Sequence, residues 1–179
     1  ENAQKASRTS RAISRYDLKE EKYYLATLHR PYNVDDIDNL KTIMNEFSKL
    51  GLPVIFPIHP RTSKTIDKYQ IEIKNNIRLI EPLGYIDFIS LQQNSKKIIT
   101  DSGGIQKEAY ILKKPCITLR SETEWNDTVE AGWNLLVDIR KKPQFSSLVE
   151  DFEPPNIHKP LFGNDVGNIM LNEIKKILA

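Results

Sequence analysis

The side chains best suited to chemistry gather in residues 100–108, which read Thr-Asp-Ser-Gly-Gly-Ile-Gln-Lys-Glu. Asp101 and Ser102 can each cap the start of a helix. Gly103 and Gly104 follow, so a ligand could approach bare backbone in the first turn of that helix. Free N–H groups at a helix start, with the positive end of the helix dipole, attract phosphate. The segment predicts a phosphate-binding corner, with an ordinary turn between strand and helix as the alternative.

Further charged or titratable side chains could act on a ligand at that corner. Glu108 lies about one helical turn beyond the glycines and could accept hydrogen bonds from sugar hydroxyls beside a phosphate. His29 ends an apolar stretch, where an imidazole is held rigidly and titrates near neutral pH. With Arg30 it could neutralise a diphosphate leaving group or donate a proton to it; the alternative is a hydrogen bond to a neighbouring loop. Arg120 could pair with a nearby glutamate or with a phosphate.

Several common motifs are absent from the sequence. No Gly-Lys-Ser/Thr follows the glycine pair, so the corner is not a P-loop, and no Gly-x-Gly-x-x-Gly dinucleotide fingerprint is present. Nothing resembles a serine on a nucleophile elbow. A run of acidic residues after Arg120 has no histidine or cysteine at ligand spacing, so solvated loop acids rather than a metal site are expected: Glu122, Glu124, Asp127 and Glu130.

The elements that must position these side chains alternate along the chain. Short apolar strands are predicted at residues 22–28, 53–58, 77–80, 97–100, 116–119 and 133–137. Helices are predicted at residues 35–50 (closed by Gly51), 62–69, 87–94, 105–112 and 166–178, and residues 138–160 are predicted to be mainly loop. Buried strands alternating with helices indicate an α/β fold with a Rossmann-like parallel sheet and helices on both faces.

Polar and cationic residues gather at the C-terminal ends of five of these predicted strands. Right-handed crossovers place all five strand-to-helix loops along one edge of the sheet, where open α/β sheets bind ligands. The loops comprise residues 29–30, 59–61, 83–85, 101–104 and 120–124. We therefore expect a nucleotide or another phosphate ester to bind at this edge.

The composition fits one globular domain of 179 residues, with 39% hydrophobic and 28% charged residues. No apolar run approaches the roughly 18–20 residues of a membrane span, and the polar N-terminus does not read as a secretory signal, so no membrane partner is expected. A net charge of +2 gives no indication of nucleic-acid binding. The single cysteine, Cys116, excludes an internal disulfide and favours a cytoplasmic setting. Residues 1–20 predict a polar helical lead-in that leans on another unit, and residues 21–179 the domain itself.

A series of motifs now resembles a known family. Residues 27–33 read Thr-Leu-His-Arg-Pro-Tyr-Asn, residues 57–60 Pro-Ile-His-Pro, and residues 82–88 Pro-Leu-Gly-Tyr-Ile-Asp-Phe. The glycine segment follows, and then Lys-Pro at residues 114–115, Arg-Ser-Glu-Thr-Glu at 120–124 and Val-Glu-Ala-Gly at 129–132. Over about residues 23–138 the chain resembles the UDP-N-acetylglucosamine 2-epimerase family, and the segment Asp-Ser-Gly-Gly-x-Gln-x-Glu is quite specific to that family.

The resemblance implies one half of a two-domain, glycosyltransferase-B arrangement that interconverts UDP-GlcNAc and UDP-ManNAc without a cofactor, in cell-surface polysaccharide biosynthesis. This chain corresponds to the C-terminal, UDP-binding half. The implied partners are a UDP-sugar, the missing N-terminal domain that carries the proton-transferring carboxylates, and a second subunit in a homodimer. The fragment alone is expected to be inactive.

The resemblance also implies roles for individual residues. Ser102, Gly103 and Gly104 would hold the diphosphate, and Glu108 would hold the ribose. Main-chain groups around Leu83 and Phe88 would read the uracil. His29 would lie by the β-phosphate as the catalytic residue, and Arg120 completes the predicted substrate-binding set.

The chain departs from the family pattern at three places. Tyr32 and Lys107 each stand where the family usually has a glutamate, and Trp-Asn-Asp at residues 125–127 replaces the common Arg-Pro-Glu, so that Trp125 takes the place of an arginine. Two other functions stay open at this point: the nucleotide-sugar-binding domain of a glycosyltransferase of the same architecture, and a regulatory domain without catalysis. The His-Arg-x-x-Asn sequence at residues 29–33 favours the epimerase over the transferase.

Overall fold

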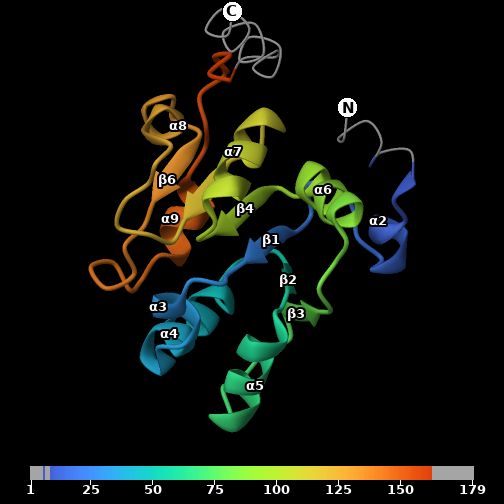
Figure 1. Ribbon diagram of the computed structural model, residues 1–179, viewed down its shortest axis with the longest axis vertical. Coiled ribbons are helices and arrows are strands. Elements are labelled where there is room, and N and C mark those ends of the chain that lie inside the picture. Colours follow the sequence, from blue (N-terminus) through green and yellow to red (C-terminus); the bar gives the residue numbers. More distant parts are fainter. Residues whose placement is uncertain (1–5, 7–8, 163–179) are drawn as a thin grey trace, which may run out of the picture.

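The computed structural model describes residue 6 and residues 9–162, and a six-stranded parallel sheet forms its centre (Figure 1). The strands lie in the order β3-β2-β1-β4-β5-β6, and every pairing is parallel. The predicted Rossmann-like α/β fold is confirmed. The bounds are β1 (Tyr24–Thr27), β2 (Val54–Pro57), β3 (Ile77–Ile80), β4 (Lys97–Thr100), β5 (Cys116–Thr118) and β6 (Asn134–Leu136).

Helices cover both faces of the sheet, as expected (Figure 1). One face carries the larger apolar cluster, where the ring of Phe47 meets Phe56 and Phe145 edge to face at 6.3 Å. Its helices are α3 (Pro31–Val34), α4 (Ile37–Phe47), α5 (Pro60–Lys68) and α9 (Ser146–Asp151). The other face is covered by α2 (Ala12–Arg15), α6 (Tyr85–Asn94) and α7 (Gly103–Ile111), and α8 (Asn126–Glu130) precedes β6. In the described ranges no helix is long and apolar enough to cross a membrane.

The chain divides at β1 and β4, which are neighbours in the middle of the sheet. They are in register from Tyr24 opposite Lys97 to Thr27 opposite Thr100, so their following loops leave the sheet side by side. From β1 the chain continues to β2 and β3 on one side, whereas from β4 it continues to β5 and β6 on the other. A sheet binds ligands at such a switch point, and here the histidine and glycine segments meet.

The structure contains short helices that the sequence pattern did not predict. α3 was not predicted, whereas α5, predicted at residues 62–69, begins two residues earlier; both helices start at a proline, Pro31 and Pro60. Proline suits the first helical position because its missing N–H group would have no partner there. The helix predicted to close at Gly51 ends instead at Phe47, and Gly51 does not take the left-handed conformation of a helix-ending glycine. The helix predicted at residues 166–178 lies outside the described residues.

The helix α9 shows why residues 138–160 are not all loop. Lys97 of β4 has a buried side chain, and its ammonium group donates hydrogen bonds to the carbonyl oxygens of Val149 (2.8 Å) and Glu150 (2.9 Å). It also lies 3.2 Å from Oε1 of Glu153. The last carbonyls of a helix lack partners within the helix, and a buried charge needs hydrogen bonds. Each therefore satisfies the other, and β4 holds the end of α9 against the sheet.

Candidate functional site

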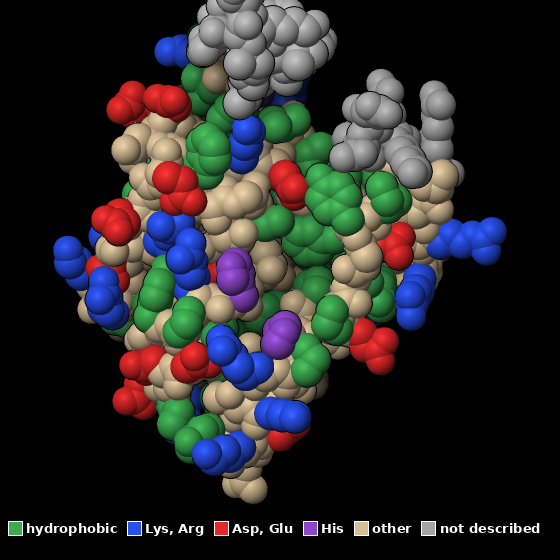
Figure 2. Space-filling model, in the orientation of Figure 1, with side chains coloured by type: hydrophobic (Ala, Val, Ile, Leu, Met, Phe, Trp, Pro, Cys, Tyr) green, Lys and Arg blue, Asp and Glu red, His purple; other side chains and the backbone are tan. Residues whose placement is uncertain are grey.

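A pocket of about 320 Å³ opens at the switch point, and we call it the switch-point pocket. It brings together four of the predicted site residues: His29 after β1, Leu83 just before α6, Phe88 within α6 and Ser102 just before α7. The remaining lining residues are Thr27, Leu28, Pro57, His59, Pro82 and Ile105. Two histidine side chains lie near the middle of this face of the molecule, with Lys and Arg side chains beside them (Figure 2).

The glycine corner (residues 101–105) carries backbone donors at one wall of this pocket. The helix α7 begins at Gly103, with Ser102 as the residue before its first turn, and the first helical hydrogen bond runs from Gln106 N to Ser102 O. The N–H groups of Gly103, Gly104 and Ile105 have no hydrogen-bond partner among the residues described. Three such donors at the positive end of a helix can hold an anion.

The two glycines differ in what surrounds them. A Cβ at Gly103 would lie 1.8 Å from Oε1 of Glu124, so the missing side chain leaves room for that carboxylate. A Cβ at Gly104 would meet only Ser102 Oγ, at 4.0 Å. The bare backbone expected at both positions is therefore open to a ligand only at Gly104.

Arg120 pairs with Glu124, one of the partners that the sequence allowed. Its Nη1 atom lies 2.8 Å from Oε2 of Glu124, which holds the carboxylate beside the glycine corner. A hydrogen bond from its own backbone N–H, followed by the Arg120 guanidinium and the charge of Arg30, lowers the pKa of Glu124 below its ordinary value. A ligand anion at this corner would meet two guanidinium groups and one carboxylate.

The histidine corner (residues 29–33) is organised by Asp101. This carboxylate is fully buried and accepts hydrogen bonds from the backbone N–H groups of His29 and Arg30 (3.0–3.2 Å) and from Nδ2 of Asn33 (3.0 Å). Asn33 also donates to the carbonyl oxygen of Leu119 at 3.1 Å. The expectation that Asp101 caps α7 is wrong, because its side chain turns back across the sheet to the loop after β1.

The imidazole of His29 is held on one side and open on the other. Its Nδ1 atom lies 3.1 Å from Oδ1 of Asp101, while 53% of the side chain is exposed. It lines the switch-point pocket and also an adjoining hollow shared with His59, Arg61 and Thr62. A ring in this position can present Nε2 to an anion while Nδ1 stays at the carboxylate.

His59, in contrast, serves the backbone. Its Nδ1 atom accepts a hydrogen bond from Arg61 N at 3.1 Å, so the ring caps the start of α5. Arg61 lies 3.4 Å from Oδ1 of Asp35, an exposed pair that adds little stability. The motif at residues 57–60 thus builds one wall of the site through a helix start.

Glu108 is fixed by α6. Its carboxylate accepts hydrogen bonds from Nε2 of Gln92 (2.7 Å) and from the hydroxyl of Tyr85 (3.2 Å). Gln92 is fully buried, so it holds one carboxylate oxygen in place. The hydrogen bond from Tyr85 is exposed, which leaves Glu108 able to accept hydrogen bonds from further hydroxyl groups.

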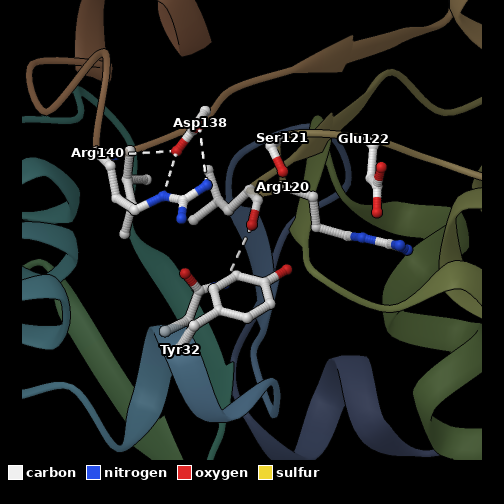
Figure 3. Close-up of a pocket in the computed structure, with 9 residues that line it drawn as sticks. Tyr32, Arg120, Ser121, Glu122, Asp138 and Arg140 are labelled. Carbon is white, nitrogen blue, oxygen red and sulfur yellow. Dashed lines mark hydrogen bonds and ion pairs between the residues drawn. The ribbon is translucent and has the colours of Figure 1, made fainter.

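A second pocket, of about 190 Å³, lies beyond the histidine corner (Figure 3). The ring of Tyr32 faces Arg140, whose guanidinium is bound by Asp138 at 3.0 and 3.1 Å. Burial, and then the charge of Asp101, raises the pKa of Tyr32. Arg120 lines this pocket rather than the switch-point pocket and reaches the glycine corner through Glu124. Among the described residues, no cluster of three or more His, Cys, Asp or Glu could hold a metal ion.

Two departures from the family pattern contact each other. The ammonium group of Lys107 lies 5.2 Å from the ring centre of Trp125 and 5.0 Å from that of Phe162. The rings of Trp125 and Phe162 are 5.5 Å apart, edge to face. A cation against aromatic faces stabilises this arrangement, so one contact on the outer side of α7 accounts for both Lys107 and Trp125.

Comparisons with known proteins identify one family. A family profile described as UDP-N-acetylglucosamine 2-epimerase matches residues 1–152. A UDP-N-acetylglucosamine 2-epimerase homolog of Methanococcus maripaludis is 42% identical over 93% of this chain and 48% of its own length. The UDP-N-acetylglucosamine 2-epimerase of Methanocaldococcus jannaschii is 42% identical over 79% of this chain and 41% of its own length.

A solved structure of the same family is similar to nearly the whole of this chain. The crystal structure of the Methanocaldococcus jannaschii UDP-GlcNAc 2-epimerase in complex with UDP-GlcNAc and UDP superposes with a TM-score of 0.83 at 35% identity. The match covers 98% of this chain and 51% of that one. The chain therefore spans about half the length of the relatives that it matches.

Proposed function

The chain belongs to the UDP-N-acetylglucosamine 2-epimerase family, and from this membership we propose that it is the UDP-binding, C-terminal half of an enzyme that interconverts UDP-GlcNAc and UDP-ManNAc. In this proposal residues 21–179 form the UDP-binding domain, and residues 1–20 lead in from an N-terminal domain. The complete enzyme is proposed to be a cytoplasmic homodimer that supplies cell-surface polysaccharide biosynthesis.

One observation carries the proposal most directly. The N–H groups of Gly103, Gly104 and Ile105 have no partner in the described part of the chain, and they lie at the start of a nine-residue helix. Ser102 and His29 line the pocket beside them. Backbone donors, a helix dipole and a titratable imidazole together suit a diphosphate.

The remaining roles follow from the positions around that pocket. The diphosphate rests on Ser102 and Gly104, with Gly103 allowing Glu124 and Arg120 to approach. Main-chain groups near Leu83 and Phe88 read the uracil, because both residues line the same pocket. Glu108 accepts the ribose hydroxyls, and His29 faces the β-phosphate.

The proposed reaction inverts C2 of the sugar by elimination and addition. A base removes the proton on C2, the bond from C1 to oxygen breaks, and UDP leaves with the electron pair. UDP then adds back to C1 after C2 is protonated from the other face. In this scheme His29 and Arg30 stabilise the departing diphosphate, while carboxylates of the N-terminal domain move the C2 proton. The 179-residue chain by itself is then a binding domain without activity.

Binding and exchange experiments test these two statements separately. We expect UDP to bind the isolated chain weakly, with a dissociation constant near 1 mM, or about −4 kcal/mol, because half of the cleft is missing. Amide shifts during a UDP titration should centre on residues 101–108. Solvent deuterium should not enter C2 of UDP-GlcNAc. Shifts that avoid the glycine corner would contradict the site, and deuterium incorporation would place the base in this half.

A further inference from the structure

The buried carboxylate of Asp101 binds one short stretch of chain rather than the helix that follows it. It receives the N–H groups of His29 and Arg30 and the side-chain amide of Asn33, and it lies 3.1 Å from Nδ1 of His29. None of the free N–H groups of α7 reaches it. From this arrangement we propose that Asp101 is a positioning residue for His29, an inference that rests on the proposed function.

The surroundings of the carboxylate fix it before any ligand arrives. Asn33 is fully buried and bonds Asp101 with one amide hydrogen and the carbonyl oxygen of Leu119 with the other. The ends of β1, β4 and β5 are thereby joined through two buried side chains. A residue held in this way can set the orientation of its neighbour more sharply than a residue on a free loop.

The orientation has a chemical consequence for the imidazole. An ionised carboxylate only accepts hydrogen bonds, and its charge 3.1 Å from Nδ1 of His29 favours a proton on that nitrogen in the neutral ring as well as in the charged one. Nε2 is then the atom that can meet a ligand on the exposed side. When the ring is charged, its Nε2–H group can donate to an oxygen of the departing diphosphate. Asp101 stays beside Nδ1 throughout, and no proton passes to Asp101.

The same contacts leave the backbone N–H groups at the start of α7 available to an anion. Because Asp101 takes its hydrogen bonds from the histidine corner, it does not consume the N–H groups of Gly103 and Gly104. A carboxylate capping α7 would occupy those donors and repel a phosphate. The negative charge of Asp101 therefore lies beside the imidazole of His29 and not at the proposed diphosphate position.

The test measures the ring itself. The 179-residue chain is labelled with ¹⁵N in its three histidine rings, long-range ¹H–¹⁵N spectra identify the protonated nitrogen of each neutral ring, and His29→Gln assigns the signals. Asp101→Asn is compared with Asp138→Asn, which removes another carboxylate that follows a strand but binds Arg140. UDP is titrated into the wild type, Asp101→Asn and Asp138→Asn.

In the wild type we expect neutral His29 to carry its proton on Nδ1. Asp101→Asn should lose this preference and bind UDP about tenfold more weakly, whereas Asp138→Asn should change neither property. A wild-type ring protonated on Nε2, or an unaltered His29 in folded Asp101→Asn, would overturn the inference. If Asp101→Asn does not fold, the wild-type spectrum still decides. Failure of the wild type to bind UDP, with Nδ1 protonated, would overturn the proposed function while supporting the orientation of the ring by Asp101.

Discussion

The two corners at the switch point use their backbone N–H groups in opposite ways. At the histidine corner, the N–H groups of His29 and Arg30 are both bound by the buried Asp101. At the glycine corner, those of Gly103 and Gly104 have no partner within the described ranges. The first arrangement gives a rigid loop that presents side chains, and the second gives a rigid helix that presents backbone. We therefore expect the loss of a group that holds the histidine corner to lower stability, and a change at the glycine corner to affect chiefly ligand binding.

The largest expected effect is the loss of UDP binding in Gly104→Asp. The new Cβ has open space, so the domain should fold, but the carboxylate would stand where phosphate oxygens bind. Repulsion between the new carboxylate and the diphosphate should weaken UDP binding by at least about a hundredfold, so that amide shifts would no longer detect it. Gly104→Ala is the matched control and should bind UDP within about threefold of the wild type. Equal losses in both variants would show that space, not charge, limits the glycine corner.

The next-largest effect is a difference in the free energy of unfolding between a variant at the histidine corner and a variant at the glycine corner. Asn33→Ala removes two buried hydrogen bonds, one of them to the Asp101 carboxylate, and should lower the free energy of unfolding by about 2 kcal/mol. Ser102 makes no side-chain cap to α7, so Ser102→Ala should change it by less than about 0.5 kcal/mol. Urea unfolding of both variants measures this difference. Similar losses would mean that the glycine corner is as constrained as the histidine corner.

A smaller effect is expected for the sugar of the nucleotide. Glu108→Gln keeps the shape of the side chain but removes the charge that would receive ribose hydroxyls. The affinity for UDP should fall by about five- to tenfold, while the affinity for pyrophosphate, which has no ribose, should stay almost unchanged. Titrations of both ligands, with Glu122→Gln as the control on an exposed loop, measure the ratio. An equal loss of both ligands would show that Glu108 acts on the phosphates or on the fold.

Local patterns predicted the frame of the molecule well. The bounds of β3 and β4 follow directly from short apolar runs, and the position of the site follows from the order of strands and helices. Both are properties of neighbouring residues. The motif at residues 101–108 likewise located the glycine corner, because a helix start after a strand is a local event.

Contacts between distant segments could not be predicted in this way. Asp101 looks like a helix cap in its own sequence context, yet its partners lie about 70 residues earlier. Gly103 looks like room for a ligand, yet Glu124 fills that room. The choice in each case depends on the parallel pairing of β1, β4 and β5, which brings these loops together. Only the folded sheet decides which of two good local interactions is made.

The smallest expected effect concerns Glu124, the carboxylate shared between Arg120 and the glycine corner. The pKa of Glu124 is lower in the folded protein than its ordinary value, so the ionised group stabilises the fold above the unfolded pKa. That contribution is lost as the pH falls through the folded pKa. Because about half of the Glu124 side chain is exposed, solvent screens the pair and the contribution should stay below about 0.5 kcal/mol. Glu124→Gln should therefore lower the melting temperature slightly at pH 7, and the difference from the wild type should vanish at acid pH. Glu122→Gln, two residues away on the same exposed loop, is the control and should show no such dependence on pH. If the melting temperature of Glu124→Gln stays below that of the wild type at acid pH, the carboxylate acts through packing against Gly103 rather than through its charge.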